Sequence, residues 1–297
     1  MSTTTRPVWE EEPSAVGKGF KGLGLGAICL LILGPLWVVV LTSVSDARTI
    51  TEAGGLVVVP GGLSVRAYQE ILTGGAVTRA VVVSLGLTGV GTAVSMLVSV
   101  LAAYGLSRRG TWGHRPILLA MMVTMFFGAG LIPTYLLIQN LGLMDSYWSL
   151  VLPSAVNVFN LLVLRAFFMG VAPELIDSAR IDGAGEWRIL LQIVLPLSRA
   201  VVAVVALFYA VGYWSAWFNA SLYLNDQHRY PLQNILNSFV LRQQAPTGMS
   251  QAINTGAVPA LSVQMAVMVL ALVPVVCVYP FVQKHFQKGM LIGAVKG

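Results

Sequence analysis

Six long stretches of the chain contain no charged residue, and this spacing limits the fold more than any other feature. The uncharged stretches are 22–45, 80–107, 116–144, 146–164, 200–225 and 243–283. Each is near or above the ~18–20 residues that a helix needs to cross the hydrocarbon core of a bilayer. Helices are the expected form because lipid cannot satisfy exposed backbone groups. The sequence therefore predicts an all-α integral membrane protein with six transmembrane helices.

The predicted spans account for most of the chain. We place them at about 22–45, 80–107, 116–139, 147–168, 198–222 and 262–284. Residues 1–21 and 286–297 are then cytoplasmic tails, 22–79 hold the first span with an external segment, and 80–285 form the core. The first apolar stretch is longer than the roughly 7–15 residues of a signal peptide, so we expect it to remain as an anchor.

The basic residues predict the orientation of the chain. Six spans place both termini on one side of the membrane, and if that side is the cytoplasm, 13 of the 18 Lys and Arg residues are cytoplasmic. Because cytoplasmic segments are enriched in Lys and Arg, an N-in, C-in topology is favoured. The same bias explains the net charge of +6, and anionic lipid is its expected partner. Nucleic acid is not, because the basic residues are dispersed beside the spans.

A polar segment at 173–196 separates the fourth and fifth predicted spans. Pro173 suits the first position of a helix, and the acids that follow it favour the helix dipole. Gly183 stands where a C-terminal cap needs a left-handed residue. A second short helix, roughly 186–193, leads to Pro196, which stops or kinks the chain. The segment therefore predicts a rigid helix–turn–helix outside the lipid.

The first helix of this segment has a narrow apolar face, to which we assign Leu175, Ile176 and Ala179. Such a shallow face suits docking into a socket on a partner protein. The alternative is a surface helix that lies on the membrane. Against this alternative, the polar side of the segment carries both signs of charge, whereas lipid binding would favour Lys and Arg.

The spacing of three landmarks in this segment resembles the EAA loop of bacterial ABC-importer permeases. The landmarks are Asp177-Ser178-Ala179, then Gly183, then Ile193-x-Leu195-Pro196. Asp177 replaces the usual Glu and Ser178 the first Ala. Flanking stretches at 102–108, 130–135 and 214–219 resemble the permeases of carbohydrate importers, in the branch associated with oligosaccharides and complex sugars.

The resemblance implies a type I ABC-importer permease fold, a place in the bacterial plasma membrane and a role in sugar import. It also implies three partners: a homologous second permease, an ABC ATPase dimer and an extracytoplasmic sugar-binding protein. The residues that it assigns to ATPase coupling are Glu174, Asp177, Ser178, Ala179, Arg180, Asp182, Gly183, Ile193, Leu195 and Pro196.

The chain shows no motor of its own. A P-loop needs Gly, four residues and Gly-Lys-Ser/Thr, and Gly17-Lys18 lacks both the upstream glycine and the hydroxyl residue. Away from their ends, the predicted spans hold no acidic or basic residue of the kind that ion-driven carriers use. We therefore expect no cofactor or metal in this chain, with ATP and Mg²⁺ bound by the partner ATPase, and no enzymatic activity.

A sugar path would offer amides, hydroxyls and aromatic faces. The candidates are Asn157 and Asn160, one helical turn apart on the fourth span, with Tyr213, Trp214, Trp217 and Asn219 on the fifth. The alternative roles are interhelical hydrogen bonding, worth ~0.6–2 kcal/mol, and an aromatic belt. Small residues on the second span, Gly91, Ser95, Ser99 and Ala103, are interpreted as a packing stripe.

Two other functions remain open at this stage. One is a permease for a non-sugar solute such as a peptide or a phosphonate. The other is an intramembrane enzyme such as a serine protease, which would need a histidine at membrane depth. His114, His228 and His285 all fall in loops or at the ends of predicted spans, which makes this alternative the weaker one.

Overall fold

The computed structural model describes residues 15–73, 75–108, 110, 113–241, 253 and 258–294. Helices dominate these residues, and no β-strand occurs among them beyond an isolated bridge between Ser45 and Leu63. The chain divides into two compact units, Met1–Gln69 with Ala252–Val269 and Glu70–Gln251 with Leu270–Gly297. We call them the smaller and the larger unit. The all-α prediction is confirmed.

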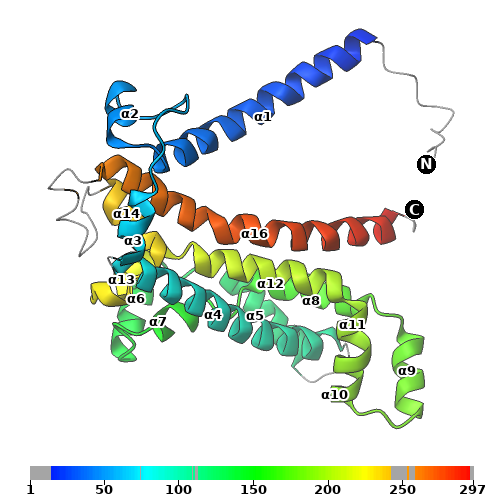
Figure 1. The fold of residues 1–297 in the computed structure, drawn as a ribbon. Helices are drawn as coiled ribbons and strands as arrows, with labels where there is room; N and C mark the ends of the chain where they lie inside the picture. Colours follow the sequence, from blue (N-terminus) through cyan, green and yellow to red (C-terminus); the bar gives the residue numbers. More distant parts are fainter. Residues whose placement is uncertain are drawn as a thin grey trace. The chain divides into compact units, whose positions relative to one another are not determined.

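The smaller unit is built on helix α1, Ala15–Ser43, followed by the short helix α2, Ala47–Glu52 (Figure 1). Asp46 caps α2 by accepting a hydrogen bond from the backbone N–H of Thr49 at 2.8 Å. Helix α1 begins at Ala15 rather than near residue 22, so part of the predicted tail is helical, and residues 1–14 lie outside the described residues.

Two helices cross the boundary between the units. They are α3, Arg66–Thr73, and α16, Ala260–Ala294. Helix α16 continues through most of the predicted C-terminal tail, and residues 295–297 lie outside the described part. Leu261, at the start of α16, packs on a small apolar cluster of Leu41, Ile50 and Val57 within the smaller unit.

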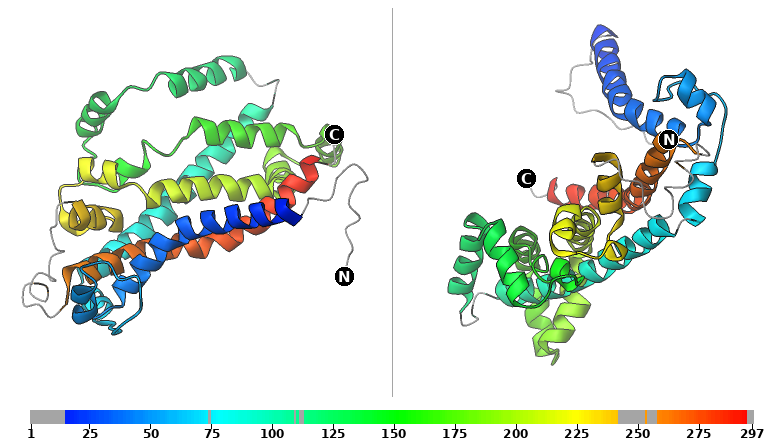
Figure 2. Two further views of the ribbon diagram at one scale, coloured as in Figure 1. Left: turned by 90° about the horizontal axis from the view of Figure 1, so that it is seen from above. Right: turned by 90° about the vertical axis from the view of Figure 1, so that its left-hand side faces the viewer.

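Three helices that contact one another form the centre of the larger unit (Figures 1 and 2). They are α4, Ala76–Ser107, α8, Val158–Met169, and α12, Arg199–Trp214. The other elements of this unit are α5 (His114–Phe126), α6 (Leu131–Asn140), α7 (Trp148–Val151), α9 (Pro173–Ile181), α10 (Glu186–Ile189), a π-helix (Leu190–Val194), α11 (Leu195–Leu197), α13 (Trp217–Tyr223), a 3₁₀ turn (Gln227–Arg229) and α14 (Leu232–Leu241).

Three described helical segments are long and apolar enough to cross a membrane, namely Gly17–Ser43, Ala76–Ser107 and Ala260–Val278. Three bent helix pairs would raise the number to six: α5 with α6 at 117°, α8 with α9 at 70°, and Glu186–Leu197 with α12 at 86°. The chain is therefore a multi-pass membrane protein. Its third, fourth and fifth spans are not the straight helices that hydropathy predicts.

Glycine and proline mark two breaks in the helices, one within the bent pair of α5 and α6 and one between α7 and α8. Gly130, between α5 and α6, has φ +85°, a conformation that side chains rarely adopt. Residues 152–157 separate α7 from α8 and contain Pro153, which lacks a backbone donor. The predicted span 147–168 is thus a short helix, an irregular turn and a second helix. This irregular turn forms part of the cavity described below.

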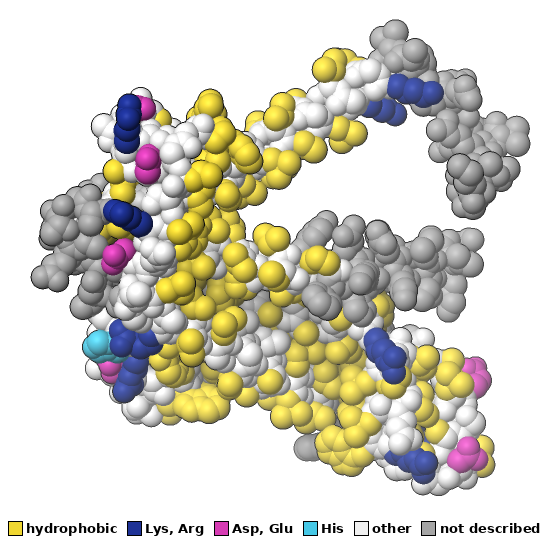
Figure 3. All heavy atoms as spheres, in the orientation of Figure 1, with side chains coloured by type: hydrophobic (Ala, Val, Ile, Leu, Met, Phe, Trp, Pro, Cys, Tyr) yellow, Lys and Arg dark blue, Asp and Glu magenta, His cyan; other side chains and the backbone are white. Residues whose placement is uncertain are grey.

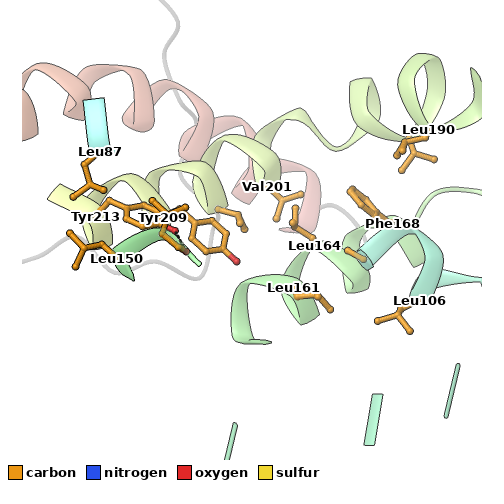
Figure 4. Packing of buried hydrophobic residues seen from close by; sticks show 14 of the residues in the cluster. Leu87, Leu106, Leu150, Leu161, Leu164, Phe168, Leu190, Val201, Tyr209 and Tyr213 are labelled. Carbon is orange, nitrogen blue, oxygen red and sulfur yellow. Dashed lines mark hydrogen bonds between the residues drawn. The ribbon is translucent and has the colours of Figure 1, made fainter. Parts of the chain in front are cut away.

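The small-residue stripe on α4 packs against another helix, as predicted, and its partners are tyrosines of α12. A Cβ atom on Gly91 would lie 2.8 Å from the Tyr213 ring, so only glycine fits there. The Ser95 and Ser99 hydroxyls bond to the Tyr213 and Tyr209 hydroxyls at 2.8 and 2.7 Å. Figure 4 shows these tyrosines among buried leucines of the core. Because these hydroxyls bond to one another, the polar side chains are buried in an apolar core without losing their hydrogen bonds.

Candidate functional site

Helix α9 begins and ends as the sequence predicts. Pro173 occupies its first turn, and Gly183 follows it with φ +77°. The Gly183 N–H donates to the Arg180 carbonyl at 3.0 Å, and the Ala184 N–H donates to the Ala179 carbonyl at 2.9 Å. This pair of bonds defines a Schellman motif, in which glycine supplies the left-handed turn. The position of Gly183 therefore fixes the direction in which the chain leaves α9.

The predicted apolar face of α9 needs correction. Ile176 is buried at 6% exposure and Ala179 packs beside it on the core, whereas Leu175 is 47% exposed. Adjacent residues of a helix point about 100° apart, so Leu175 and Ile176 cannot share one narrow face. The outward side instead carries Leu175, Ser178 and the 86%-exposed Ile181. Trp187 on α10, 65% exposed, is a further surface aromatic that the motif does not predict.

A glutamate holds the two halves of the loop to the end of α4. Glu186 Oε1 accepts a bond from Arg180 at 2.7 Å, and Oε2 accepts one from the Tyr104 hydroxyl at 2.5 Å. Arg108 lies 4.7 Å above the Tyr104 ring and 3.5 Å from the same carboxylate. We call Tyr104, Arg108, Arg180 and Glu186 the Glu186 clasp. It joins α9, α10 and α4 through one carboxylate.

The clasp keeps its glutamate ionised. Two hydrogen bonds lower the pKa of Glu186 below its usual value. The larger effect comes from the Tyr104 hydroxyl and the smaller one from Arg180. A lowered pKa means that the clasp is intact at neutral pH and is lost only as the pH falls through that lowered value. Figure 3 shows side chains of both charge signs over α9 and α10, as the sequence predicts.

Apart from the clasp, few contacts hold α9 to the rest of the unit. Ile176 is its only buried residue. A cavity of about 440 Å³ lies beside it, lined by Ser107, Arg108, Phe168, Met169, Val171, Pro173, Ile176, Asp177 and Arg180. Helix α9 is thus attached through Ile176 and Ala179 on its apolar side and through the clasp on its polar side, and the clasp is its link to α4.

The second half of the loop contains a π-helix where the sequence predicts a regular helix to residue 193. The Leu195 N–H donates to the Leu190 carbonyl, five residues back. Pro196 follows directly and cannot donate a backbone bond, so the wider turn accommodates it. Ile193 and Leu195 pack on the core. The chain then bends by 86° into α12, so Pro196 lies at the bend as expected.

A second cavity, of about 530 Å³, lies between the turn before α8 and the end of α12. It is lined by Pro153, Ser154, Val156, Asn157, Asn160, Phe208, Tyr209, Gly212, Tyr213, Ser215, Ala216, Phe218 and Asn219. Four predicted path residues therefore meet here: Asn157, Asn160, Tyr213 and Asn219. Amides, hydroxyls and aromatic rings line the cavity without any charged side chain, which suits a hydroxyl-rich molecule.

The sequence predicts that Asn157 and Asn160 lie one turn apart on a helix. The structure differs, because only Asn160 lies within a helix. Asn157 precedes α8 and caps it, because its side chain accepts a bond from the Asn160 N–H at 3.1 Å. The backbone N–H of Asn157 in turn donates to the Tyr209 hydroxyl at 2.9 Å. Asn157 thus shapes the cavity wall, while Asn160 is buried within it, at 5% exposure.

The two tryptophans of the predicted path do not line this cavity. Trp214 is buried, and its indole N–H donates to the Ala271 carbonyl at 3.1 Å. Trp217 begins α13 and contacts Phe218 edge to face at 5.7 Å. The residues that sequence reasoning missed include Phe208, Gly212 and Ser215. Their spacing of four and three along one helical face is a signal that could have found them.

Residues 82–292 match the family described as the binding-protein-dependent transport system inner membrane component. The polygalacturonan/rhamnogalacturonan transport system permease protein YtcP of Bacillus subtilis is 44% identical over 242 residues, which cover 81% of this chain and 85% of that protein. Protein LplC of Bacillus subtilis is 38% identical and covers 92% of both chains.

A solved structure has the same fold. The crystal structure of a bacterial ABC transporter involved in the import of the acidic polysaccharide alginate contains a chain that matches with a TM-score of 0.87. The two chains are 28% identical, and the match covers 93% of this chain and all of that one (100%). The bent helix pairs therefore belong to a permease fold.

Proposed function

The chain belongs to the family of inner membrane components of binding-protein-dependent transport systems, and from this premise we propose that it carries complex, acidic oligosaccharides as half of an ATP-driven importer. Two relatives support the cargo proposal. The 44%-identical permease is named for pectic polysaccharides, and the structurally similar transporter is involved in the import of alginate. Both of these cargoes are chains that contain acidic sugars.

The observation that carries the proposal is the cavity of about 530 Å³ with its uncharged polar lining. Its amides and hydroxyls can bond sugar hydroxyls, and Phe208 and Tyr213 offer ring faces to the flat C–H surfaces of a pyranose. The cavity holds no cation for a sugar carboxylate. The path needs a second half, so we assign the carboxylate contacts to a homologous second permease.

The loop from Pro173 to Pro196 is the proposed lever. A docked ATPase dimer would press on the outward side of α9, where Leu175, Ser178 and Ile181 are exposed, and on Trp187. Aromatic anchors of this kind dominate many protein interfaces once they are buried. ATP and Mg²⁺ then belong to the ATPase, and this chain needs no nucleotide site of its own. The bacterial plasma membrane is its proposed location, with an extracytoplasmic binding protein that delivers the sugar.

The enzyme alternative gains no support from the histidines. His114 begins α5, and its Nε2 atom lies 3.3 Å from an Arg165 nitrogen. His228 lies in the 3₁₀ turn. Neither lines the cavity described above. No observation favours a peptide or a phosphonate over a saccharide.

Replacing Asn219 with alanine is expected to lower uptake of labelled oligogalacturonides about tenfold. Asn219 lines the cavity, and its amide has no hydrogen-bond partner among the described residues, so it is free to bond a sugar. Losing one or two such bonds costs about 1.5 kcal/mol. The ATPase should still co-purify with the variant.

Asn140→Ala is the control for this experiment, because Asn140 is an exposed amide at the end of α6 and away from the cavity. Unchanged uptake by the Asn219→Ala variant would count against the cavity as the sugar path. Loss of subunit assembly in that variant would instead assign Asn219 a packing role.

A further inference from the structure

An apolar groove on the larger unit lies apart from both the loop and the sugar cavity. It is a space of about 270 Å³ between α4 and α7, lined by Val83, Gly86, Leu87, Val90, Tyr147, Trp148 and Val151. A Cβ atom on Gly86 would meet nothing within 4 Å, so this glycine leaves the groove open. Trp148 is 48% exposed and Val90 52% exposed beside it.

A cation stands at one end of the same helical face. Residues 79, 83, 86 and 90 recur at spacings of four, three and four, which places Arg79 in line with the groove on α4. At 1.5 Å per residue this face is about 16 Å long. Arg79 is exposed, and it forms no ion pair with any residue that the structure describes. It lies within electrostatic range of the Tyr147 hydroxyl on the opposite wall, as do Arg229 and its ion-pair partners Asp145 and Asp226.

We propose that this groove binds an anionic phospholipid, with one acyl chain along Val83, Gly86 and Val90 and the phosphate paired with Arg79. A guanidinium matches a phosphate with two parallel hydrogen bonds. The apolar slot and the cation at its end that has no ion pair among the described residues together fit an amphiphile, because each contacts one part of the same molecule. The site is independent of the transported sugar and of the ATPase.

The aromatic wall supports a lipid as the occupant. Tyr and Trp side chains are enriched at the level of lipid headgroups, where their rings are partly apolar and partly wet. Tyr147 and Trp148 both line this groove, and Tyr147 lies within electrostatic range of Arg79. A helix of another subunit is a poorer fit, since a helix is about 10 Å wide with its side chains and an apolar one would leave Arg79 without an anion.

Native mass spectrometry of the intact detergent-purified complex can test this site. The complex is incubated with phosphatidylglycerol or with phosphatidylcholine of the same acyl chains, and retained lipid is counted. We expect one phosphatidylglycerol to be retained at least about tenfold better than phosphatidylcholine. Arg79→Gln should abolish that preference, and Gly86→Leu, which fills the groove, should abolish retention of this lipid.

Matched controls separate the site from general effects of substitution. Arg66→Gln removes another exposed arginine that is unpaired among the described residues, and Gly89→Leu adds the same side chain at a glycine of α4 that does not line the groove. Both should retain the lipid as the unaltered chain does. If Gly86→Leu fails to reach the membrane, Val90→Phe fills the same groove from the next turn.

Three results would overturn the proposal. The first is equal retention of the two lipids by the unaltered complex. The second is equal loss of lipid in the control variants. The third is a Gly86→Leu complex that loses its second permease but keeps its lipid, because that outcome would identify a helix of the other subunit as the occupant.

Discussion

The Gly183→Asp variant is expected to lose at least about 99% of uptake while it still reaches the membrane. Gly183 has φ +77° and open space around it, so a side chain meets no clash, and the left-handed backbone costs roughly 1–2 kcal/mol. The fold should tolerate this cost. The loop should not, because the Schellman turn directs α10 toward the clasp, and the new carboxylate adds to the charge of the neighbouring Asp182.

The control for that variant is Gly142→Asp. Gly142 has φ +67°, also with nothing within 4 Å of a built Cβ atom, and it lies after α6, away from the loop. The backbone strain and the added charge are therefore the same in both variants. Uptake in vesicles and the amount of chain in the membrane are measured together. Normal uptake by the Gly183→Asp variant would contradict a coupling role for this turn.

Replacing Glu186 with alanine is expected to reduce the sugar transported per ATP hydrolysed by about tenfold or more. The change removes the carboxylate to which Arg180 and Tyr104 donate at 2.7 and 2.5 Å. Helix α9 would then be anchored through Ile176 without its polar tie to α4. The ATPase should still bind and hydrolyse ATP, since the outward side of α9 is unchanged. Proteoliposomes that report uptake and phosphate release in the same sample measure this ratio.

A Glu52→Ala variant controls for the loss of an ion pair. Glu52 accepts a bond from Arg48 at 2.7 Å on the surface of the smaller unit, and such exposed pairs contribute little. The transport ratio should stay unchanged in it. If Glu186→Ala leaves the ratio intact, or if it releases the ATPase from the complex, the clasp does not transmit motion to α4.

Local rules predicted the parts of the site that depend on backbone chemistry. The proline start and the glycine end of α9 follow from capping rules, and the structure has both at the predicted residues. The stripe from Gly91 to Ala103 also followed from residue size, since only small side chains admit the rings of Tyr209 and Tyr213. These features need no knowledge of distant residues.

The remaining differences come from long-range contacts. Hydropathy cannot distinguish Trp214, which bonds to a carbonyl of α16, from a residue that faces a cavity. It also cannot show that Asn157 caps a helix that begins after a break near Pro153. The role of Glu186 could not be predicted from the sequence, because its three partners lie 6, 78 and 82 residues away. The assignment of Ile176 to the outward face failed because the motif does not define the angle at which α9 meets the core.

Disulfide cross-linking from Ser178 tests most directly whether the loop is gripped by an ATPase. Ser178 is exposed on the outward side of α9, so a Ser178→Cys variant in a chain without Cys29 and Cys277 presents one thiol at the docking face. With a mild oxidant, this thiol should form a disulfide with a cysteine introduced on the loop-binding surface of the ATPase subunit, and that disulfide should stop uptake until it is reduced. Reaction with lipid-borne thiol reagents alone, with no protein joined to the loop, would contradict the account.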